Sequence, residues 1–276
     1  MDLSKSQKEN NNGLLATLSR IRQLAKAKPQ AGPVIPNVEL VLQLMLEADM
    51  QPHGLMPWSS NYTFLVSLTR ASDQAQLLAV YKPCAGERPL WDFPEGSLCH
   101  REFASYLISQ VLGWPNIPPT ILRQGPHGEG SVQLFVEAEY EAHYFNMRDT
   151  SVFTPQFRQI ALFDYIVNNA DRKGGHCLKD KHGYLWAIDH GLTFHTDFKL
   201  RTVIWDFCNE SIPASLLEDL AHFQQLLKND SFLVETMRYY LNYREIKALK
   251  RRVDLLVSRG HFPDIHPGRN IPYPPI

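Results

Sequence analysis

The stretch "NNADRKGGHCLKDKHGYLWAIDHG", residues 168–191, gathers acidic, basic and imidazole side chains between two apolar runs. Asp171 follows an apolar segment and starts a glycine-containing loop, where a carboxylate can accept a proton from an attacking hydroxyl. Asp189 comes directly after the apolar run "LWAI", and a carboxylate at the end of a buried strand can bind a divalent cation. His176 could face the same site as a metal ligand. The alternative is a polar surface hairpin with two ordinary turns.

Two charged residues earlier in the chain could belong to the same site. Lys82 stands near the end of the apolar run "LLAVYK", where its ammonium could enter a cleft and hold phosphate oxygens. Glu102, in "HREFASYL", would lie on a helix and could pair with Lys82 to orient it. Each of them alone is better explained as a solvated charge. Together, the order Lys, Glu, Asp, Asp is the order of the protein kinases, and it favours phosphoryl transfer.

The elements that would position these residues can be predicted from the hydrophobic pattern. In the first half we expect a helix that Asn37 caps, then a β-hairpin, a helix that ends at Gly113 and a second hairpin. These segments span residues 37–50, 61–70 with 76–82, 96–113, and 119–124 with 131–138.

The second half is predicted to be mostly helical. Thr154 would cap a helix over residues 154–170, with Pro155 at its first position. Two short strands, 177–178 and 185–188, would flank a turn at 181–183. Three further helices would follow, over residues 215–229, 231–241 and 243–260.

This order of elements predicts an α+β protein with a small mixed β-sheet lobe carrying one main helix, followed by a mostly helical lobe. We expect a flexible N-terminal arm over residues 1–36 with one helix near residues 13–27, an N-lobe over 37–140, a C-lobe over 141–262 and a Pro-rich extended tail over 263–276. A cleft between two such lobes is a common place for a ligand.

Composition excludes several classes of function. The chain has 276 residues and a formal net charge of -1, so it lacks the basic field that nucleic-acid binding requires. No apolar run approaches the length of a membrane span, and "MDLSKSQKENNNG" does not read as a signal peptide. The 4 cysteines are scattered without a CxxC pair, so we expect reduced thiols in a cytoplasmic protein, with neither a disulfide framework nor a zinc ribbon.

Several motifs resemble the phosphatidylinositol 3-/4-kinase superfamily: "VYKP", "REFASYL", "FVE", "NNADRKGGH" and "AIDHGLTF". The similarity is to its compact bacterial members and to type II phosphatidylinositol 4-kinases, and it runs from about Val38 to Arg259. The pattern "YKPxxGERPLWDFPxGxLxxRE" is its most specific part, and it is similar to a bacterial family of kinase-like proteins. The resemblance implies a two-lobed protein-kinase-like fold.

The resemblance also implies how ATP would be bound. Lys82 would contact the α- and β-phosphates, and Glu102 would pair with it. A hinge would meet adenine through its backbone, at Phe135, Val136 and Glu137. The loop from Pro57 to Phe64 would cover the phosphates. It has no GxGxxG, so its donors would come from Ser59, Ser60 and Asn61.

For the chemical step, the resemblance makes Asp171 the catalytic-loop residue and Asp189 the metal ligand, with ATP and Mg²⁺ as cofactors. His176 stands where the superfamily usually has a metal-binding Asn. Because Mg²⁺ prefers oxygen ligands, an imidazole there would suit Mn²⁺ better. The change therefore leaves open a weak enzyme or a second metal site that differs.

Two loops could contribute residues that contact the substrate. Residues 190–207 would form the activation segment, where Lys199 and Arg201 either meet an anionic acceptor or are solvated loop charges. The "GERPLWDFP" loop would pack near Lys82 and could bring three of its residues to the substrate, namely Arg88, Trp91 and Asp92.

The function predicted is ATP-dependent transfer of the γ-phosphate to a hydroxyl of a lipid headgroup, a small molecule or a protein. A nucleotide-binding pseudokinase with a regulatory role and an AMP transferase on the same fold are the alternatives. A metal-dependent hydrolase is a third hypothesis, in which the metal would be held by His176, Asp189, His190 and His195.

Overall fold

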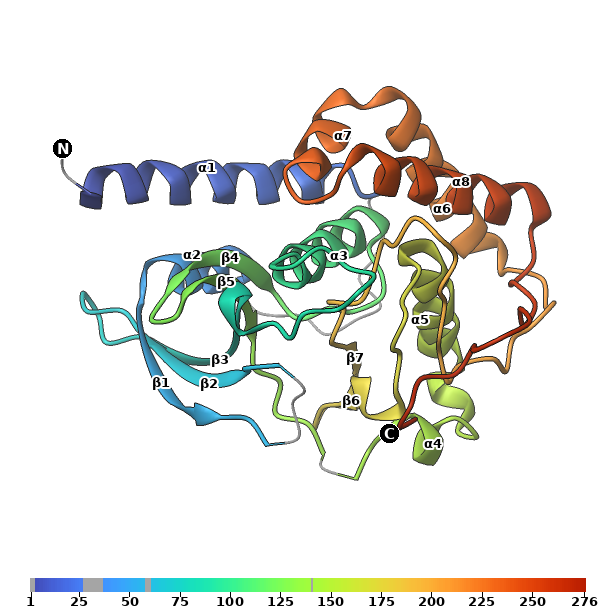
Figure 1. Ribbon diagram of the computed structural model, residues 1–276, viewed down its shortest axis with the longest axis horizontal. Helices are drawn as coiled ribbons and strands as arrows, with labels where there is room; N and C mark the ends of the chain where they lie inside the picture. Colours follow the sequence, from blue (N-terminus) through green and yellow to red (C-terminus); the bar gives the residue numbers. More distant parts are fainter. Residues whose placement is uncertain (1–2, 27–36, 58–60, 140) are drawn as a thin grey trace.

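The computed structural model describes residues 3–26, 37–57, 61–139 and 141–276. Figure 1 shows a β-sheet with its helices on one side of the molecule and a lobe of helices on the other. The predicted α+β class and two-lobed kinase-like arrangement are confirmed. The exact boundaries of the two lobes stay a prediction.

The N-lobe sheet has five strands in the order β1-β2-β3-β5-β4. Every neighbouring pair is antiparallel, so the prediction of a mixed sheet was wrong. The strands are β1 (Asp49–Leu55), β2 (Phe64–Thr69), β3 (Gln76–Pro83), β4 (Thr120–Gly125) and β5 (Gly128–Leu134). The hydrophobic pattern missed β1, because this exposed edge strand carries Pro52 and Gly54, where its register shifts.

Both predicted hairpins and the helix between them are present. In β3, Ala79 and Tyr81 are buried, while Val80 and Lys82 point to the other face of the sheet and stay partly exposed. Helix α3 (Leu98–Leu112) ends at Gly113, whose φ of 76° is readily adopted only by glycine. The alternation in β3 therefore directs Lys82 away from the hydrophobic core.

Two more helices cover the N-lobe. Helix α2 (Val38–Glu47) is capped by the Asn37 side chain as predicted. Helix α1 (Leu3–Gln23) packs on α2 and α3, with Leu18 and Ile21 fully buried, so the prediction of a flexible arm was wrong for this segment.

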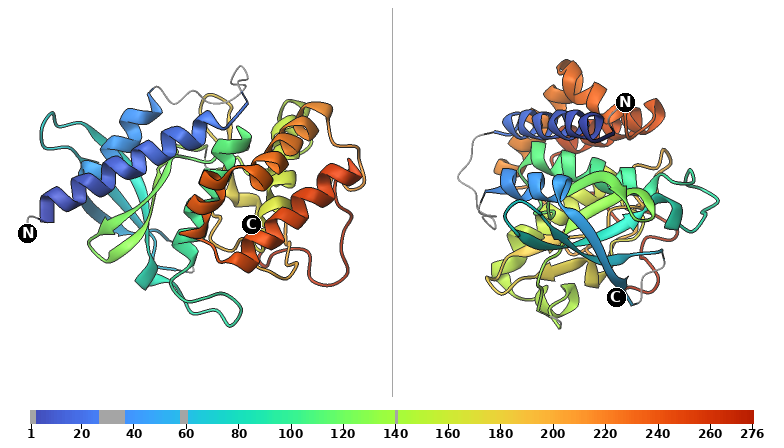
Figure 2. Two further views of the ribbon diagram at one scale, coloured as in Figure 1. Left: turned by 90° about the horizontal axis from the view of Figure 1, so that it is seen from above. Right: turned by 90° about the vertical axis from the view of Figure 1, so that its left-hand side faces the viewer.

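Helix α1 also reaches the helical lobe (Figures 1 and 2). The Arg20 guanidinium lies 3.8 Å from the centre of the Phe232 ring, and the His222 ring is hydrogen-bonded to the Leu24 carbonyl oxygen at 2.8 Å. The N-terminal helix therefore contacts both lobes.

The C-lobe is built around α5 (Thr154–Val167), which is buried over most of its length. Phe153, not Thr154, occupies its cap position, and Pro155 lies in its first turn. The lobe also contains α4 (Tyr144–Met147), the hairpin β6 (Cys177–Lys179) and β7 (Leu185–Ala187), and the helices α6 (Ala214–Asn229), α7 (Ser231–Arg238) and α8 (Tyr243–Arg259). Short 3₁₀ turns lie at η1 (Cys84–Gly86), η2 (Ser151–Phe153) and η3 (Gly174–His176).

Arg101 of α3 joins the two lobes. Its guanidinium donates to the Thr193 carbonyl oxygen at 2.5 Å and forms an ion pair with Glu245 of α8. Both charged side chains are almost fully buried. This contact holds α3 against the C-lobe, which matters because the next residue along α3 is Glu102.

The cysteines differ from expectation. Cys84 in η1 and Cys99 in α3 form a disulfide, so the prediction that all thiols are reduced was wrong for this pair. The pair lies 15 residues apart in sequence, and only the contact between η1 and α3 brings the sulfurs together. Cys177 and Cys208 are free. Among the described residues, none of the helices has the length and apolarity needed to span a bilayer.

Leu18→Ala tests whether α1 is part of the folded core. Because Leu18 is fully buried, we expect the free energy of unfolding to fall by about 2–5 kcal/mol in urea denaturation. Gly13→Ala, in the same helix but exposed with open space around it, is the control and should leave stability equal or higher. Equal stability of Leu18→Ala and wild type would contradict the packed helix.

Candidate active site

Lys82 lies at the centre of the site and is bonded to two carboxylates. Its Nζ atom is 2.6 Å from Glu102 Oε1 and 2.9 Å from Asp189 Oδ1. β3 supplies the lysine, α3 supplies Glu102, and Asp189 comes two residues after β7 in the C-lobe. The structure thus assembles three of the residues singled out in the sequence across the two lobes.

Electrostatics keep Lys82 and Asp189 charged. Burial opposes the charged form of Lys82, but Asp189 and Glu102 outweigh that effect and raise the pKa of the ammonium. Burial also works against ionisation of Asp189, yet Lys82 holds the pKa of Asp189 below its usual range. Because 46% of the Asp189 side chain is exposed, solvent screens part of this attraction. Burial raises the pKa of Glu102, and the charge of Lys82 only partly offsets this.

Asp171 begins the catalytic loop. Its backbone N–H donates to Asn169 Oδ1 at 3.0 Å, and its Oδ2 lies 3.5 Å from Lys173 Nζ. Burial raises the pKa of Asp171 to about 6, and the nearby charge of Lys173 only partly offsets this. A carboxyl group with this pKa is suited to exchange a proton near neutral pH.

His176 lies beside Asp189, with its Nε2 atom 3.3 Å from Asp189 Oδ2. Burial lowers the pKa of His176 to about 4, so the ring is neutral at pH 7. Its Nδ1 accepts the Lys173 backbone N–H at 3.3 Å, so the neutral ring carries its proton on Nε2, the nitrogen on the Asp189 side. His176 thus lies against the Asp189 carboxylate.

Arg172 organises the loops around the site and is fully buried. It forms an ion pair with Asp164 of α5, with Nε 3.0 Å from Asp164 Oδ2 and Nη2 3.0 Å from Oδ1. It also donates to the Ile188 carbonyl oxygen at 2.7 Å and to His190 Nε2 at 2.7 Å. This guanidinium therefore connects the catalytic loop to the residues on both sides of Asp189.

Of the three imidazoles proposed for a hydrolytic metal site, His176 lies beside Asp189 and the other two have different partners. His190 is fully buried and accepts its hydrogen bond from Arg172, while His195 Nδ1 contacts backbone atoms of Asp197. Among the described residues, Asp189 belongs to no close group of three or more His, Cys, Asp or Glu ligand atoms. The hydrolase hypothesis therefore loses its ligand set.

The predicted hinge lies between β5 and the C-lobe. Phe135, Val136 and Glu137 line a cavity of about 340 Å³ together with Leu78 and Trp186. The Phe135 N–H donates to the Leu78 carbonyl oxygen at 3.0 Å. In the part of the chain that the structure describes, the backbone N–H groups of Val136 and Glu137 donate to no backbone carbonyl.

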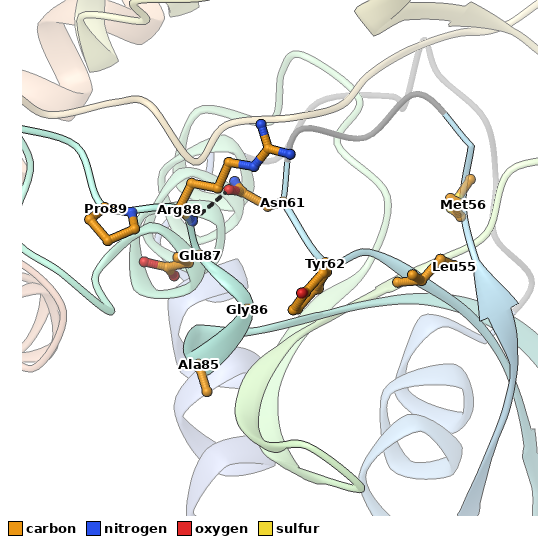
Figure 3. Close-up of a pocket in the computed structure, with 9 residues that line it drawn as sticks. All are labelled: Leu55, Met56, Asn61, Tyr62, Ala85, Gly86, Glu87, Arg88 and Pro89. Atoms are coloured by element: carbon orange, nitrogen blue, oxygen red, sulfur yellow. Dashed lines mark hydrogen bonds between the residues drawn. The ribbon is translucent and has the colours of Figure 1, made fainter.

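The predicted phosphate loop connects β1 to β2, the position that this loop has in kinases. Ser59 and Ser60 lie outside the described residues. Asn61 accepts the Arg88 backbone N–H at 2.9 Å, and both residues line a cavity of about 330 Å³ (Figure 3). The loop therefore contacts the "GER" segment that follows β3.

The chain matches known proteins at the level of sequence. Residues 120–253 match the family of phosphatidylinositol 3- and 4-kinases. Protein Rv2133c of Mycobacterium tuberculosis strain ATCC 25618 / H37Rv is 34% identical over 264 residues, which cover 84% of this chain and 94% of Rv2133c. The chain belongs to the phosphatidylinositol 3-/4-kinase superfamily.

A solved structure is also similar to this superfamily member. It is the crystal structure of a Helicobacter pylori proinflammatory kinase, CtkA, with a TM-score of 0.48 and 12% sequence identity. The similarity covers 78% of this chain and 93% of that chain.

Within this kinase-like chain, the loop residues predicted to meet the substrate contact each other. Lys199 of the activation segment forms an ion pair with Asp92 and lies 4.7 Å from the centre of the Trp91 ring. Lys199 is therefore partly neutralised. The Arg201 Nε atom is buried and has no hydrogen-bond partner among the described residues.

The donor set around Asp189 fits a divalent cation bound mainly through phosphates. Mg²⁺ is typically held by one or two carboxylates together with substrate phosphates and water, and Asp189 offers one partly exposed carboxylate. To add a nitrogen ligand, His176 would have to turn the lone pair of Nδ1 toward the cation, and that atom now accepts the Lys173 N–H. Asp189 itself has φ 60°, a left-handed backbone conformation that Asp tolerates and β-branched residues do not.

Arg172 and Asp164 are the site residues that sequence reasoning missed. The signal available was an Asp inside an otherwise apolar helix, at the start of "DYIVNNADR". A carboxylate on a buried helix face needs a cation, and Arg172 follows Asp164 eight positions later. The contact between the two side chains depends on how the chain turns after α5, and the sequence pattern does not specify that turn.

Asp164→Asn tests the buried pair. We expect it to lower the free energy of unfolding by about 3–5 kcal/mol, because it leaves the fully buried Arg172 without its counter-ion. Asp73→Asn breaks an Arg–Asp pair of similar chemistry on the surface, with Arg70, and should lower stability far less, because solvent screens the exposed pair. Urea denaturation of both variants measures the difference, and equal costs would contradict the role of burial.

Proposed function

We propose that the protein is an ATP-dependent phosphotransferase that moves the γ-phosphate of ATP to a hydroxyl group. The contact that carries this proposal is Lys82, whose ammonium reaches both Glu102 of α3 and Asp189 of the C-lobe. Phosphoryl transfer in kinases requires a strand lysine oriented by a helix glutamate, next to a metal-binding Asp. The membership in a kinase superfamily supports the same reading.

ATP would lie between the hinge and Lys82. The backbone N–H groups of Val136 and Glu137 are available to adenine, and Val80 shares the cleft-facing side of β3 with Lys82. Lys82 would hold the α- and β-phosphates. Asp189 would hold Mg²⁺ or Mn²⁺, which neutralises charge on the phosphates when it is bound. His176 would keep the Asp189 carboxylate oriented.

Asp171 would position the acceptor hydroxyl and take its proton. The buried, unpartnered Nε of Arg201 supports an acceptor with an anionic group near the reacting hydroxyl. A lipid headgroup, a phosphorylated small molecule and a protein side chain all remain within this proposal, and a transfer assay over these three pools separates them.

His176 supports a second candidate, a nucleotide-binding protein with little or no turnover. It replaces the expected oxygen ligand with an imidazole that lies 3.3 Å from Asp189 and whose Nδ1 accepts the Lys173 N–H. Turnover assays distinguish the two candidates, because both predict binding of ATP and only the kinase predicts product. Chromatography of the labelled product also distinguishes phosphate transfer from AMP transfer.

Ligand-induced stabilisation tests nucleotide binding. At a hundredfold excess over Kd, ATP with Mg²⁺ or Mn²⁺ should stabilise the folded chain by about 2.7 kcal/mol, which corresponds to a rise in Tm of about 5–10 °C. Lys82→Ala should weaken ATP binding at least tenfold, and Asp189→Asn should abolish the metal-dependent part of the shift. Lys228→Ala, an exposed lysine on α6, is the control. An unchanged ATP affinity in Lys82→Ala would contradict the phosphate role.

The pH dependence tests Asp171. Its pKa of about 6 lies above the ordinary value, so the carboxyl is protonated and inactive below that pH and ionised above it. We therefore expect kcat/KM to fall about tenfold per pH unit below 6 and to level off above 7. Asp171→Asn should lose most of kcat while keeping ATP affinity. A flat profile between pH 5 and 7 in wild type would rule out this titration.

A further inference from the structure

We propose that the Cys84–Cys99 disulfide is a reversible thiol switch that clamps the nucleotide-binding machinery of the N-lobe and sets its affinity for nucleotide. The proposal rests on the function proposed above, because it requires that the cleft binds ATP. It assigns a regulatory role to a bond that joins the turn directly after the Lys82 strand to the helix carrying Glu102.

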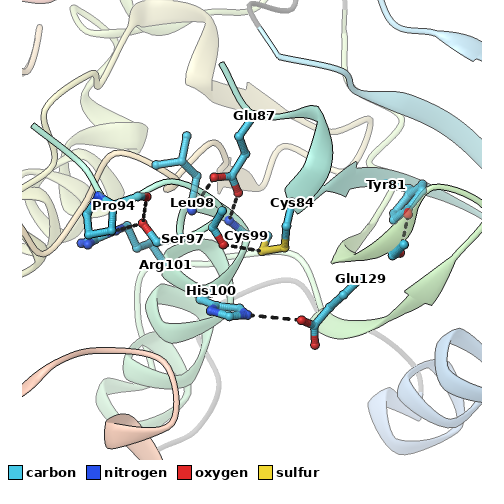
Figure 4. The surroundings of a disulfide bond; sticks show 12 residues. Tyr81, Cys84, Glu87, Pro94, Ser97, Leu98, Cys99, His100, Arg101 and Glu129 are labelled. Atoms are coloured by element: carbon cyan, nitrogen blue, oxygen red, sulfur yellow. Dashed lines mark hydrogen bonds and ion pairs between the residues drawn. A yellow bond between two sulfur atoms is a disulfide. The ribbon is translucent and has the colours of Figure 1, made fainter. Parts of the chain in front are cut away.

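The two cysteines flank the Lys82–Glu102 ion pair on both sides. Cys84 follows Lys82 by two residues, just past the end of β3. Cys99 precedes Glu102 by three residues in α3, and residues three apart lie on the same face of a helix. The disulfide (Figure 4) therefore connects α3 to the η1 turn directly after β3, and the ion pair connects α3 to β3 itself.

The segment after Cys84 also holds the phosphate loop. The Tyr62 N–H donates to the Gly86 carbonyl oxygen at 3.0 Å, and Asn61 Oδ1 accepts the Arg88 N–H at 2.9 Å. A Cβ atom on Gly86 would lie only 2.7 Å from Tyr62 Cβ, so the two segments are in close contact. A shift of η1 would therefore move the loop that is expected to cover the phosphates.

Glu87 supplies the other link from this segment to α3. Its carboxylate accepts the backbone N–H groups of Leu98 at 3.1 Å and Cys99 at 2.9 Å. Ser97, in the cap position, makes no side-chain cap hydrogen bond of its own. Once the disulfide is open, these two hydrogen bonds would have to hold the start of α3 without covalent support, and they exchange readily with water.

Access favours attack at Cys84. Its residue is partly exposed, whereas Cys99 is 2% exposed. A thiolate of an external dithiol would attack Cys84 Sγ, and Cys99 would leave as a thiolate and take up a proton. The second thiol of the reductant would then form the reductant's own disulfide and release Cys84 as a thiol. The dithiol thus supplies two electrons, and the reverse exchange restores the clamp.

The remaining cysteines are poor competitors for this exchange. Burial raises the pKa of Cys177 to about 12, which leaves almost no thiolate at neutral pH. Burial also raises the pKa of Cys208. The chain therefore offers Cys208→Ser as a matched control, since this residue takes no part in the clamp or in the cleft.

The test compares the full chain in two forms, oxidised and treated with dithiothreitol, with alkylation and intact mass to count thiols. We expect the reduced form to bind ATP with Mg²⁺ at least fivefold more weakly by calorimetry, and reoxidation to restore the affinity. Cys84→Ser should behave as the reduced form under both conditions, and Cys208→Ser should respond like wild type.

Hydrogen exchange provides a readout that needs no nucleotide. Reduction should speed exchange of the Tyr62, Leu98 and Cys99 amides, whose N–H groups donate to Gly86 and Glu87 in the segment after Cys84. Exchange in α5 should stay unchanged. If reduction speeds exchange but neither form binds ATP, the proposed function would be overturned and the clamp would be supported. Equal affinities in the two forms would overturn control of nucleotide binding, and unchanged exchange would overturn the clamp itself.

A metal on the same residues is the remaining outcome. The ligand atoms of Cys84, Cys99 and His100 lie within 4.8 Å of one another, and His100 Nε2 is 3.6 Å from Glu129 Oε2. Stoichiometric zinc in the isolated protein, with two free thiols by mass, would overturn the disulfide clamp in favour of a metal site.

Discussion

The buried ion pair between Arg172 and Asp164 is the interaction on which the site depends. One guanidinium, with no exposed surface, fixes the loop that starts at Asp171 against α5 and holds the Ile188 carbonyl and the His190 ring on either side of Asp189. Removing either partner would leave an uncompensated charge in the core, which is far more costly than losing a surface pair. The carboxylates of Asp171 and Asp189 keep their relative positions because this buried ion pair is costly to break.

The N-lobe half of the site is positioned by α3. Arg101 holds this helix to Glu245 of the C-lobe, and helix α1 packs along it and reaches the C-lobe as well. Glu102, the next residue on α3, then pairs with Lys82. The closed arrangement of Lys82, Glu102 and Asp189 is thus the consequence of contacts made outside the cleft. The same dependence explains how a bond at the start of α3 could act on nucleotide affinity.

Local patterns predicted most of the fold. The alternation of apolar and polar residues predicted both N-lobe hairpins. Helical periodicity together with capping residues predicted α2, α3, α5 and the three C-terminal helices. The failures share a cause: their signals are not local. Strand β1 contains Pro52 and Gly54 and exists because β2 offers it an edge. Helix α1 has a polar first half and is held by the packing of Leu18 and Ile21.

The sequence by itself determined which groups are available for chemistry: a lysine, a glutamate and two aspartates in the order that kinases use, with His176 in place of an oxygen ligand. Tertiary structure decided how they act. It raised the pKa of Asp171 through burial and placed His176 beside Asp189. It also joined Cys84 to Cys99 and buried Arg172 against Asp164. Burial, and pairing between residues distant in sequence, depend on the three-dimensional environment, which the spacing of residues along the chain does not encode.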